Sequence, residues 1–245
     1  MERPDNQPTQ QRPSPVVFHA HRDEDQWTWA IAVAVTSQLR RELQLKPRAR
    51  LLVSGGTTPA PVFRALSQAP LEWDRIDIAL VDERWLRPDD PDSNAHLVRE
   101  HLLRGHASAA RFETLTRPGR SIEAAVADAN LHARHPPGIV LLGMGEDGHV
   151  ASLFPQMRDL DAALHSDTPY VAVDASGCPG AGPWLRRISL TPAGLAPAHT
   201  RLLLLRGSNK RSVFERALEG DDPCEMPVRV AFNTAGAALQ VHWYP

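Results

Sequence analysis

Apolar positions along the chain follow two different spacings. From Trp27 to Leu43 an apolar residue recurs at every fourth position, as on the buried stripe of an amphipathic helix, and Lys46-Pro47 ends the pattern. Comparable patterns predict further helices over residues 59–66, 93–102, 121–133 and 208–218. Short apolar runs predict buried strands at 16–18, 51–53, 76–81, 112–115, 138–142, 170–173, 188–190, 202–205 and 239–243.

Strands that alternate with helices predict an α/β fold, with a mostly parallel sheet covered by helices on both faces. The 245 residues contain no repeat at solenoid spacing and no linker, so we expect a single domain over residues 16–245. Residues 1–15 are rich in Gln and Pro and lack the apolar region of a signal peptide. We expect them to form a disordered leader.

Composition and charge exclude several classes of partner. The net charge is −2 and the Lys and Arg residues are scattered, so there is no basic footprint for nucleic acid. No apolar stretch is long enough to span a bilayer. Cys178 and Cys224 have no Cys or His at metal-ligand spacing, which favours a reducing compartment and no metal site. We therefore expect a cytoplasmic protein that acts on a small molecule.

Three glycine-rich or charged segments each follow the carboxyl end of a predicted strand. They occupy residues 54–59, 82–84 and 143–149. Ligands of open α/β sheets bind outside these strand ends, so we expect the three segments to converge on one crevice although they are far apart in the sequence.

The first of these segments is typical of an anion cradle. Gly55 and Gly56 allow the backbone to approach an oxyanion, Thr57 adds a hydroxyl, and the next helix presents its N-terminus. The loop lacks the Lys of a P-loop, so ATP is not implied. A plain Gly-Gly turn explains the same residues.

The third segment matches the spacing of a dinucleotide fingerprint through Gly143, Gly145 and Gly148. A dinucleotide site needs a long helix after the glycines, whereas Phe154-Pro155 cuts the following helix short. An NAD-dependent oxidoreductase is therefore disfavoured, and the glycines are expected to admit a smaller ligand.

His149 is expected to start that short helix. The positive end of the helix dipole disfavours imidazolium there, which leaves a neutral ring that can accept a proton. Asp147 then either caps the helix or orients the ring. A structural histidine in an Asp-Gly turn fits the spacing equally well.

Further charged residues have two interpretations each. Lys210 and Arg211 lie in the first turn of the helix over 208–218, where the dipole disfavours cations unless a phosphate is bound. We interpret Lys210 as a phosphate ligand and Arg211 as a solvated surface residue. The cluster Asp82-Glu83-Arg84 is either part of the crevice or a structural ion pair at a strand end.

Together these motifs resemble those of the 6-phosphogluconolactonase family, in the family's order and over nearly the whole chain from about Val16. Thr57 stands where the family usually has Ser, and Val150 replaces the usual Thr, which could remove one hydrogen bond. The long motif at residues 142–155 is specific to the family, while the other motifs are short and support the resemblance by their order. The motifs are Ser-Gly-Gly-Thr-Thr-Pro at 54–59, Asp-Glu-Arg at 82–84 with Ser93-Asn94, Leu-Gly-Met-Gly-Glu-Asp-Gly-His-Val-Ala-Ser-Leu-Phe-Pro at 142–155, and Arg187 with residues 207–210.

The resemblance implies the fold shared by glucosamine-6-phosphate deaminase and ribose-5-phosphate isomerase. It implies hydrolysis of 6-phospho-D-glucono-1,5-lactone to 6-phospho-D-gluconate in the oxidative pentose phosphate pathway. His149 would be the general base for the attacking water, and Asp147 would orient its ring. The implied substrate site consists of Gly55, Gly56, Thr57, Asp82, Arg84, Gly145, Arg187 and Lys210.

No metal or organic cofactor is implied, because an activated ester requires only positioning, a base and charge stabilisation. Which of Arg84, Arg187 and Lys210 holds the phosphate and which faces the carbonyl stays open. The chain could act as a monomer or as a homodimer.

Two rival functions fit the same fold. An amino-sugar phosphate isomerase-deaminase similarly carries an Asp-Gly-His turn, but it has a carboxylate a few residues beyond its His. Phe154 stands at that position here and cannot move a proton. A catalytically silent sugar-phosphate-binding regulator needs neither Asp147 nor His149. Both arguments favour lactone hydrolysis.

Overall fold

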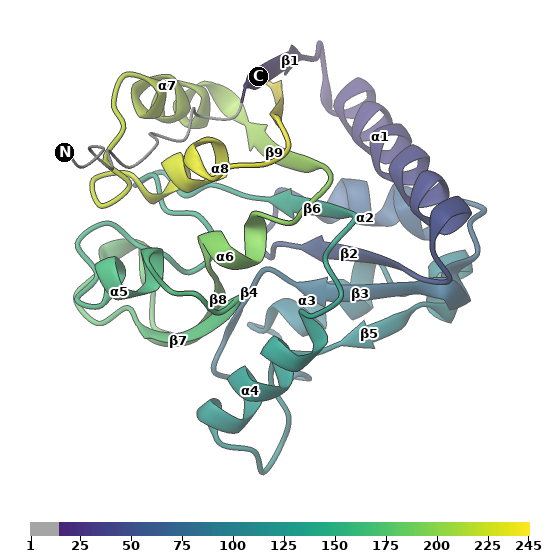
Figure 1. Ribbon diagram of the computed structural model, residues 1–245. Coiled ribbons are helices and arrows are strands. Elements are labelled where there is room, and N and C mark those ends of the chain that lie inside the picture. Colours follow the sequence, from purple (N-terminus) through teal and green to yellow (C-terminus); the bar gives the residue numbers. More distant parts are fainter. Residues whose placement is uncertain (1–14) are drawn as a thin grey trace, which may run out of the picture.

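A seven-stranded parallel sheet forms the centre of the computed structural model, which describes residues 15–245 (Figure 1). All its neighbouring strands pair in parallel, which confirms the predicted α/β class with a mostly parallel sheet. The strands in spatial order are β1 (Val16–Ala20), β10 (Leu239–Tyr244), β9 (Arg201–Arg206), β6 (Ile139–Leu142), β2 (Ala49–Val53), β3 (Ile76–Leu80) and β5 (Arg111–Glu113).

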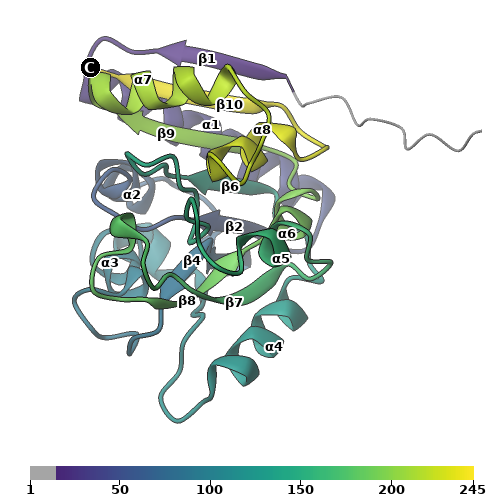
Figure 2. The ribbon, with the colours of Figure 1, turned by 90° about the vertical axis from the view of Figure 1, so that its left-hand side faces the viewer.

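The longest helix, α1 (Glu24–Leu45), buries the stripe that the four-residue spacing predicts, from Trp27 to Leu43. Its N-terminus is capped by Asp23, whose side chain accepts a hydrogen bond from the backbone N–H of Gln26 at 2.9 Å. Helices lie on both sides of the sheet, with α2 and α3 on one side and α4 and α6 on the other (Figures 1 and 2). The helices after α1 are α2 (Ala60–Ser67), α3 (Asn94–His101), α4 (Ile122–His132), α5 (Leu160–Leu164), α6 (Pro192–Leu195), α7 (Gly207–Leu218) and α8 (Val230–Asn233), with 3-10 turns η1 (Trp73–Arg75), η2 (Gly105–Ala109), η3 (Pro179–Ala181) and η4 (Pro227–Arg229).

A second, three-stranded antiparallel sheet packs beside the carboxyl ends of the main strands. It consists of β4 (Asp82–Arg84), β8 (Arg186–Leu190) and β7 (Tyr170–Asp174). The strands at 170–173 and 188–190 are therefore confirmed. Apolar runs do not specify strand partners, however, so the separate sheet and the extension of the acidic cluster into β4 were not predicted.

The short helix expected at His149 does not form, and that prediction is wrong. Residues 145–153 instead make consecutive turns, with hydrogen bonds from Gly145 N–H to the His149 carbonyl at 2.9 Å and from Gly148 N–H to the Gly145 carbonyl at 3.1 Å. Gly148 and Ala151 have φ of 83° and 53°, in the left-handed region, which interrupts any right-handed helix. Without this helix, no helix dipole acts on His149 and Asp147 has no helix to cap there.

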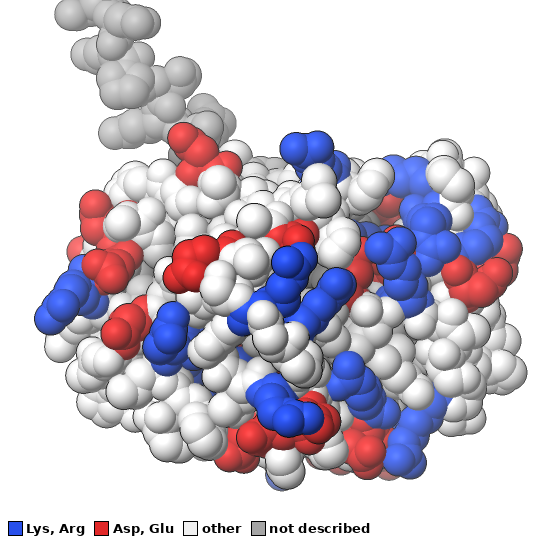
Figure 3. All heavy atoms as spheres, turned by 90° about the horizontal axis from the view of Figure 1, so that it is seen from below, with Lys and Arg blue, Asp and Glu red and all other residues white. Residues whose placement is uncertain are grey.

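The leader predicted for residues 1–15 lies outside the described residues except for Pro15, whose carbonyl accepts a hydrogen bond from Leu239 N–H. Within residues 15–245, no helix is long and apolar enough to cross a membrane. On the face shown in Figure 3, basic and acidic side chains are interspersed, as the near-neutral net charge suggests.

Candidate active site

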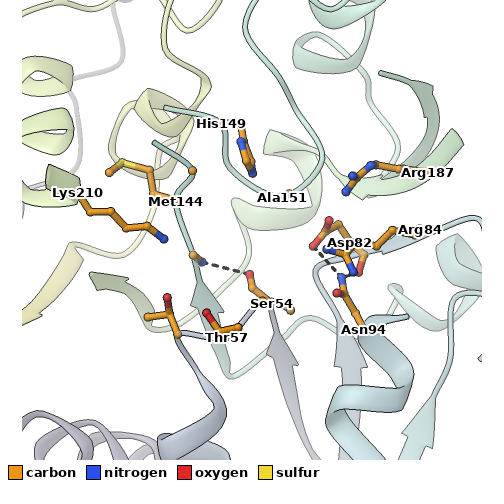
Figure 4. A pocket seen from close by; sticks show the side chains of 15 residues that line it. Ser54, Thr57, Asp82, Arg84, Asn94, Met144, His149, Ala151, Arg187 and Lys210 are labelled. Atoms are coloured by element: carbon orange, nitrogen blue, oxygen red, sulfur yellow. Dashed lines mark hydrogen bonds between the residues drawn. The ribbon is translucent and has the colours of Figure 1, made fainter. Parts of the chain in front are cut away.

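The candidate site is a cavity of about 260 Å³ at the carboxyl ends of four adjacent strands, β9, β6, β2 and β3. The three segments expected to converge do so here, and the start of α7 joins them. Every residue of the implied substrate site contributes to the wall, as does His149 (Figure 4). The lining consists of Ser54, Gly55, Gly56, Thr57, Thr58, Asp82, Arg84, Asn94, Gly143, Met144, Gly145, His149, Ala151, Arg187 and Lys210.

Asp147 holds the imidazole of His149 at the cavity wall. Its Oδ1 lies 2.6 Å from Nδ1 of His149 and also accepts the backbone N–H of His149 at 3.1 Å. Because a carboxylate can only accept, this contact places a proton on Nδ1, so that in the neutral ring the lone pair lies on Nε2. Burial alone would raise the pKa of Asp147, but the hydrogen bond and the charge of His149 outweigh it and lower this pKa. The Asp147 carboxylate therefore fixes the orientation of the His149 ring.

Phe154 lies directly against the His149 ring. Its ring centroid is 4.4 Å from that of His149, and the guanidinium carbon of Arg187 lies 5.1 Å from the same centroid. Phe154 is fully buried. The ring therefore supports both the histidine and a cation, at the position where a deaminase would be expected to carry a carboxylate.

Two glycines leave room for the Asp147–His149 pair. A Cβ on Gly145 would lie 2.1 Å from Nδ1 of His149, and a Cβ on Gly180 would lie 2.2 Å from Oδ2 of Asp147. Gly180 comes from the loop between β7 and β8 and was not among the predicted site residues. Gly145 is therefore needed for the close approach of the histidine, as well as for lining the cavity.

Arg84 and Arg187 lie side by side on one wall, since they are register partners in the β4–β8 pair. Arg187 is nearly buried and donates to the carbonyls of Trp184 at 2.8 Å and Ala181 at 2.5 Å. Burial and the charge of Arg84 lower the pKa of Arg187, while Asp82 and Glu83 oppose this shift. Nε of Arg84 is buried without a hydrogen-bond partner among the described residues.

Asp82 and Glu83 have separate structural partners. Asp82 accepts the Ser152 hydroxyl at 2.6 Å, and its carbonyl accepts the Asn94 side-chain amide at 2.8 Å. Glu83 is fully buried and accepts the backbone N–H groups of Arg84, Asn94 and Ala95, each at 2.8 Å. Burial raises the pKa of Glu83 to about 7 although these three hydrogen bonds oppose the shift. Glu83 and Arg84 form no ion pair within residues 15–245, so a structural pair between them is excluded.

Asn94 is a lining residue that the implied site did not contain. Its side chain fills the space beside Gly55, where a Cβ would lie 1.8 Å from the Asn94 Oδ1. The available signal was the predicted N-cap at Ser93, which places the next side chain at the start of α3. Gly55 is therefore required for contact with Asn94, in addition to any approach to an anion.

Lys210 lies on the opposite side of the cavity from Arg84 and Arg187, with His149 between them (Figure 4). It belongs to the first turn of α7, whose N-terminus has no side-chain cap. Burial lowers the pKa of Lys210, and Glu146 partly opposes that shift. Arg211 instead bonds to Glu215 at 2.7 Å and lies 4.7 Å from the ring centroid of Trp243. Lys210 therefore lines the cavity, whereas Arg211 contacts other side chains outside it.

The loop after β2 completes the side that contains Lys210. The Ser54 hydroxyl accepts the backbone N–H of Gly143 at 3.3 Å, which joins this loop to the loop after β6 (Figure 4). Gly56 has φ of 84°, a conformation that a glycine adopts without strain. Thr57 and Thr58 add hydroxyl groups just before α2. Backbone and hydroxyl donors at two helix N-termini thus surround one end of the cavity.

Comparisons with known proteins identify relatives of this chain. A family model described as glucosamine-6-phosphate isomerases/6-phosphogluconolactonase matches residues 22–243. A 6-phosphogluconolactonase from Xylella fastidiosa (strain Temecula1) is 52% identical over 230 residues, which cover 93% of this chain and 96% of that protein. A crystal structure of a 6-phosphogluconolactonase from Shewanella baltica aligns with a TM-score of 0.87 at 34% identity, covering 94% of this chain and 98% of that one. A monomeric glucosamine-6-phosphate deaminase, 18% identical with a TM-score of 0.74 and 92% and 96% covered, shares the fold.

Proposed function

The chain belongs to the family of glucosamine-6-phosphate isomerases and 6-phosphogluconolactonases, within which it is an enzyme of the 6-phosphogluconolactonase type, and we propose that His149 is the general base of its reaction. The substrate is 6-phospho-D-glucono-1,5-lactone and the product is 6-phospho-D-gluconate. The observation that carries the proposal is the contact of 2.6 Å between Asp147 and His149 at the wall of a cavity with cations on both sides.

The reaction begins when Nε2 of His149 takes a proton from a water molecule whose oxygen attacks C1 of the lactone. The new C–O bond forms as the carbonyl electrons move onto the carbonyl oxygen, and the Asp147 carboxylate stabilises the imidazolium. When the tetrahedral intermediate collapses, the bond from C1 to the ring oxygen breaks. The imidazolium returns its proton to that oxygen, which becomes the C5 hydroxyl, and the new carboxylic acid loses its proton to solvent.

We assign the phosphate to the side of the cavity that holds Lys210. A phosphate dianion needs many N–H and O–H donors, and this side offers the loop from Gly55 to Thr58, the start of α2, and Lys210 at the start of α7. The assignment leaves Arg84 and Arg187 to face the lactone carbonyl. There the guanidinium of Arg84 would stabilise the oxyanion as negative charge develops.

Deamination of an amino-sugar phosphate is the nearest rival, and the surroundings of His149 disfavour it. The side chain packed on the imidazole is Phe154, which has no proton to transfer. A silent sugar-phosphate-binding regulator would not require the Asp147–His149 hydrogen bond. Lactone hydrolysis uses the Asp147–His149 pair and needs no proton donor at the position of Phe154.

The proposed function is tested by following freshly prepared 6-phosphogluconolactone with the purified chain in the presence of EDTA. Consumption faster than the spontaneous hydrolysis, with no conversion of glucosamine 6-phosphate in a parallel sample, is the expected result. If a folded sample gives only the spontaneous rate, the proposal is wrong. A cytoplasmic location and the monomer or homodimer state stay predictions, the second of which sedimentation would settle.

A further inference from the structure

A second hollow lies beside the active-site cavity and shares three of its residues. Its volume is about 410 Å³, and its lining includes Arg84, His149 and Arg187 together with Asp92 and Trp184. Its other lining residues come from two loops, one between β4 and α3 and the other between β7 and β8. His149 and both arginines therefore line this hollow as well as the active-site cavity.

One side-chain hydrogen bond joins these two loops across the hollow. The indole Nε1–H of Trp184 donates to Oδ2 of Asp92 at 3.1 Å. The backbone carbonyls of the same two residues hold the arginines, because Arg84 donates to the Asp92 carbonyl at 2.5 Å and Arg187 donates to the Trp184 carbonyl at 2.8 Å. The four residues thus form a closed ring of contacts, since β4–β8 pairing joins Arg84 to Arg187.

We propose that Trp184 and Asp92 are positioning residues that hold the two guanidinium groups in place for the reaction. Like charges directly opposite each other on paired strands repel. The guanidinium groups of Arg84 and Arg187 would therefore move apart unless each side chain were anchored. The carbonyl of Asp92 anchors one arginine and the carbonyl of Trp184 the other. The Trp184–Asp92 bond fixes the distance between these two anchors.

The proposal rests on the proposed function, because it assumes that the arginines act on the lactone. A displacement of about 1 Å in a group that stabilises a transition state lowers a rate by up to roughly 100-fold. Breaking one neutral-to-charged hydrogen bond in a partly exposed loop should have a smaller effect. We expect kcat/KM to fall about 3- to 20-fold, mainly in kcat, with the melting temperature unchanged.

The test is a double-mutant cycle on lactone turnover with Trp184→Phe, Asp92→Ala and the combined variant. If the two side chains act through their mutual bond, the double variant is no slower than the slower single variant. Asp92→Asn removes the same charge as Asp92→Ala but keeps an amide oxygen that can accept from the indole, so it should restore most of the rate. Asp89→Ala in the same loop and Trp29→Phe on the exposed face of α1 serve as controls that should retain full activity.

Multiplicative losses in the double variant would overturn the proposal, because they would show two independent effects. Equal rates for Asp92→Asn and Asp92→Ala would also overturn it, as would wild-type rates in all variants. Failure of the proposed function looks different, since the wild-type chain itself would then show no turnover. Binding of 6-phosphogluconate, measured by calorimetry on each variant, checks that the sugar-phosphate site is intact.

Discussion

Arg84 and Arg187 are paired directly across β4 and β8, which places two positive charges side by side on one wall of the active site. Such a pair is destabilising by itself, by about 0.2–1 kcal/mol on the scale of cross-strand pairs. Burial of Arg187 adds a desolvation cost, which is the first cause of its lowered pKa. The free enzyme therefore carries charge that a negatively charged reaction centre would relieve.

The first prediction concerns removal of one of these charges. Arg84→Met should leave the free energy of unfolding unchanged or slightly increased, because the repulsion between the arginines disappears. The same variant should lose about 100- to 1,000-fold in turnover, the usual effect of removing one oxyanion donor. Denaturant unfolding and steady-state kinetics on one preparation measure both quantities. Arg186→Met is the matched control, since this neighbour on β8 is exposed and lies opposite Asp174 in the β7–β8 register.

The second prediction separates two adjacent cations of α7. Lys210→Met should lower kcat/KM about 10- to 100-fold, mostly through KM, because a charge-assisted contact to phosphate is lost. Arg211→Met should change kcat/KM less than twofold, since that side chain contacts Glu215 and Trp243 outside the cavity. Equal effects of the two substitutions would remove Lys210 from the phosphate site.

The third prediction follows from the space beside the base. In Gly145→Ala the new methyl group would lie 2.1 Å from Nδ1 of His149, so the imidazole or the turn must move. We expect kcat to fall by about 100-fold, the typical effect of a 1 Å misplacement, while the far-UV circular dichroism spectrum is retained. Wild-type turnover in this variant would show that the position of the ring tolerates such a shift.

The fourth prediction concerns acid stability rather than catalysis. His242 on β10 is buried against His19 of β1 and His21 just after that strand, with ring centroids 4.6 Å and 5.2 Å away. Burial and then the charges of these two histidines lower the pKa of His242 to about 3. The folded state thus binds fewer protons than the unfolded state between pH 6.5 and 3. The stability that the neutral His242 contributes is therefore complete above pH 6.5 and is lost as the pH falls through this window.

Urea unfolding at several pH values tests this linkage. Between pH 7 and 5 the wild-type chain should lose more free energy of unfolding than His242→Gln, by at most about 1.4 kcal/mol per pH unit, which corresponds to one proton. His21→Gln serves as a comparison, because burial also lowers the pKa of that more exposed neighbour. Parallel pH curves for wild type and His242→Gln would contradict the assignment.

The sequence predicted the main sheet well because its signals were local and strong. The four-residue stripe of α1 and the continuous apolar runs of β2, β6 and β9 depend only on burial, and all four elements formed. The convergence of distant segments followed from the general position of ligands at the carboxyl ends of parallel strands. The same rule brought the loop after β2 and the turn at His149 into one cavity.

Features that depend on partners distant in the sequence were missed. A turn forms at His149 in place of the expected helix because Ala151 has a positive φ, which no residue pattern predicts. The pairing of Arg84 with Arg187 depends on the register between β4 and β8, and sequence alone does not give register across more than 100 residues. Gly180 and Trp184 belong to a loop that has no motif of its own.

The central claim is that His149, oriented by Asp147, is the general base, and one variant tests it most directly. His149→Ala should lose about 100- to 10,000-fold in lactone turnover, while calorimetry shows binding of 6-phosphogluconate close to that of the wild type. This combination is expected because the phosphate is assigned to Lys210 and the loop of residues 54–58 on another side of the cavity. Turnover of a folded His149→Ala variant at the wild-type rate would contradict the account.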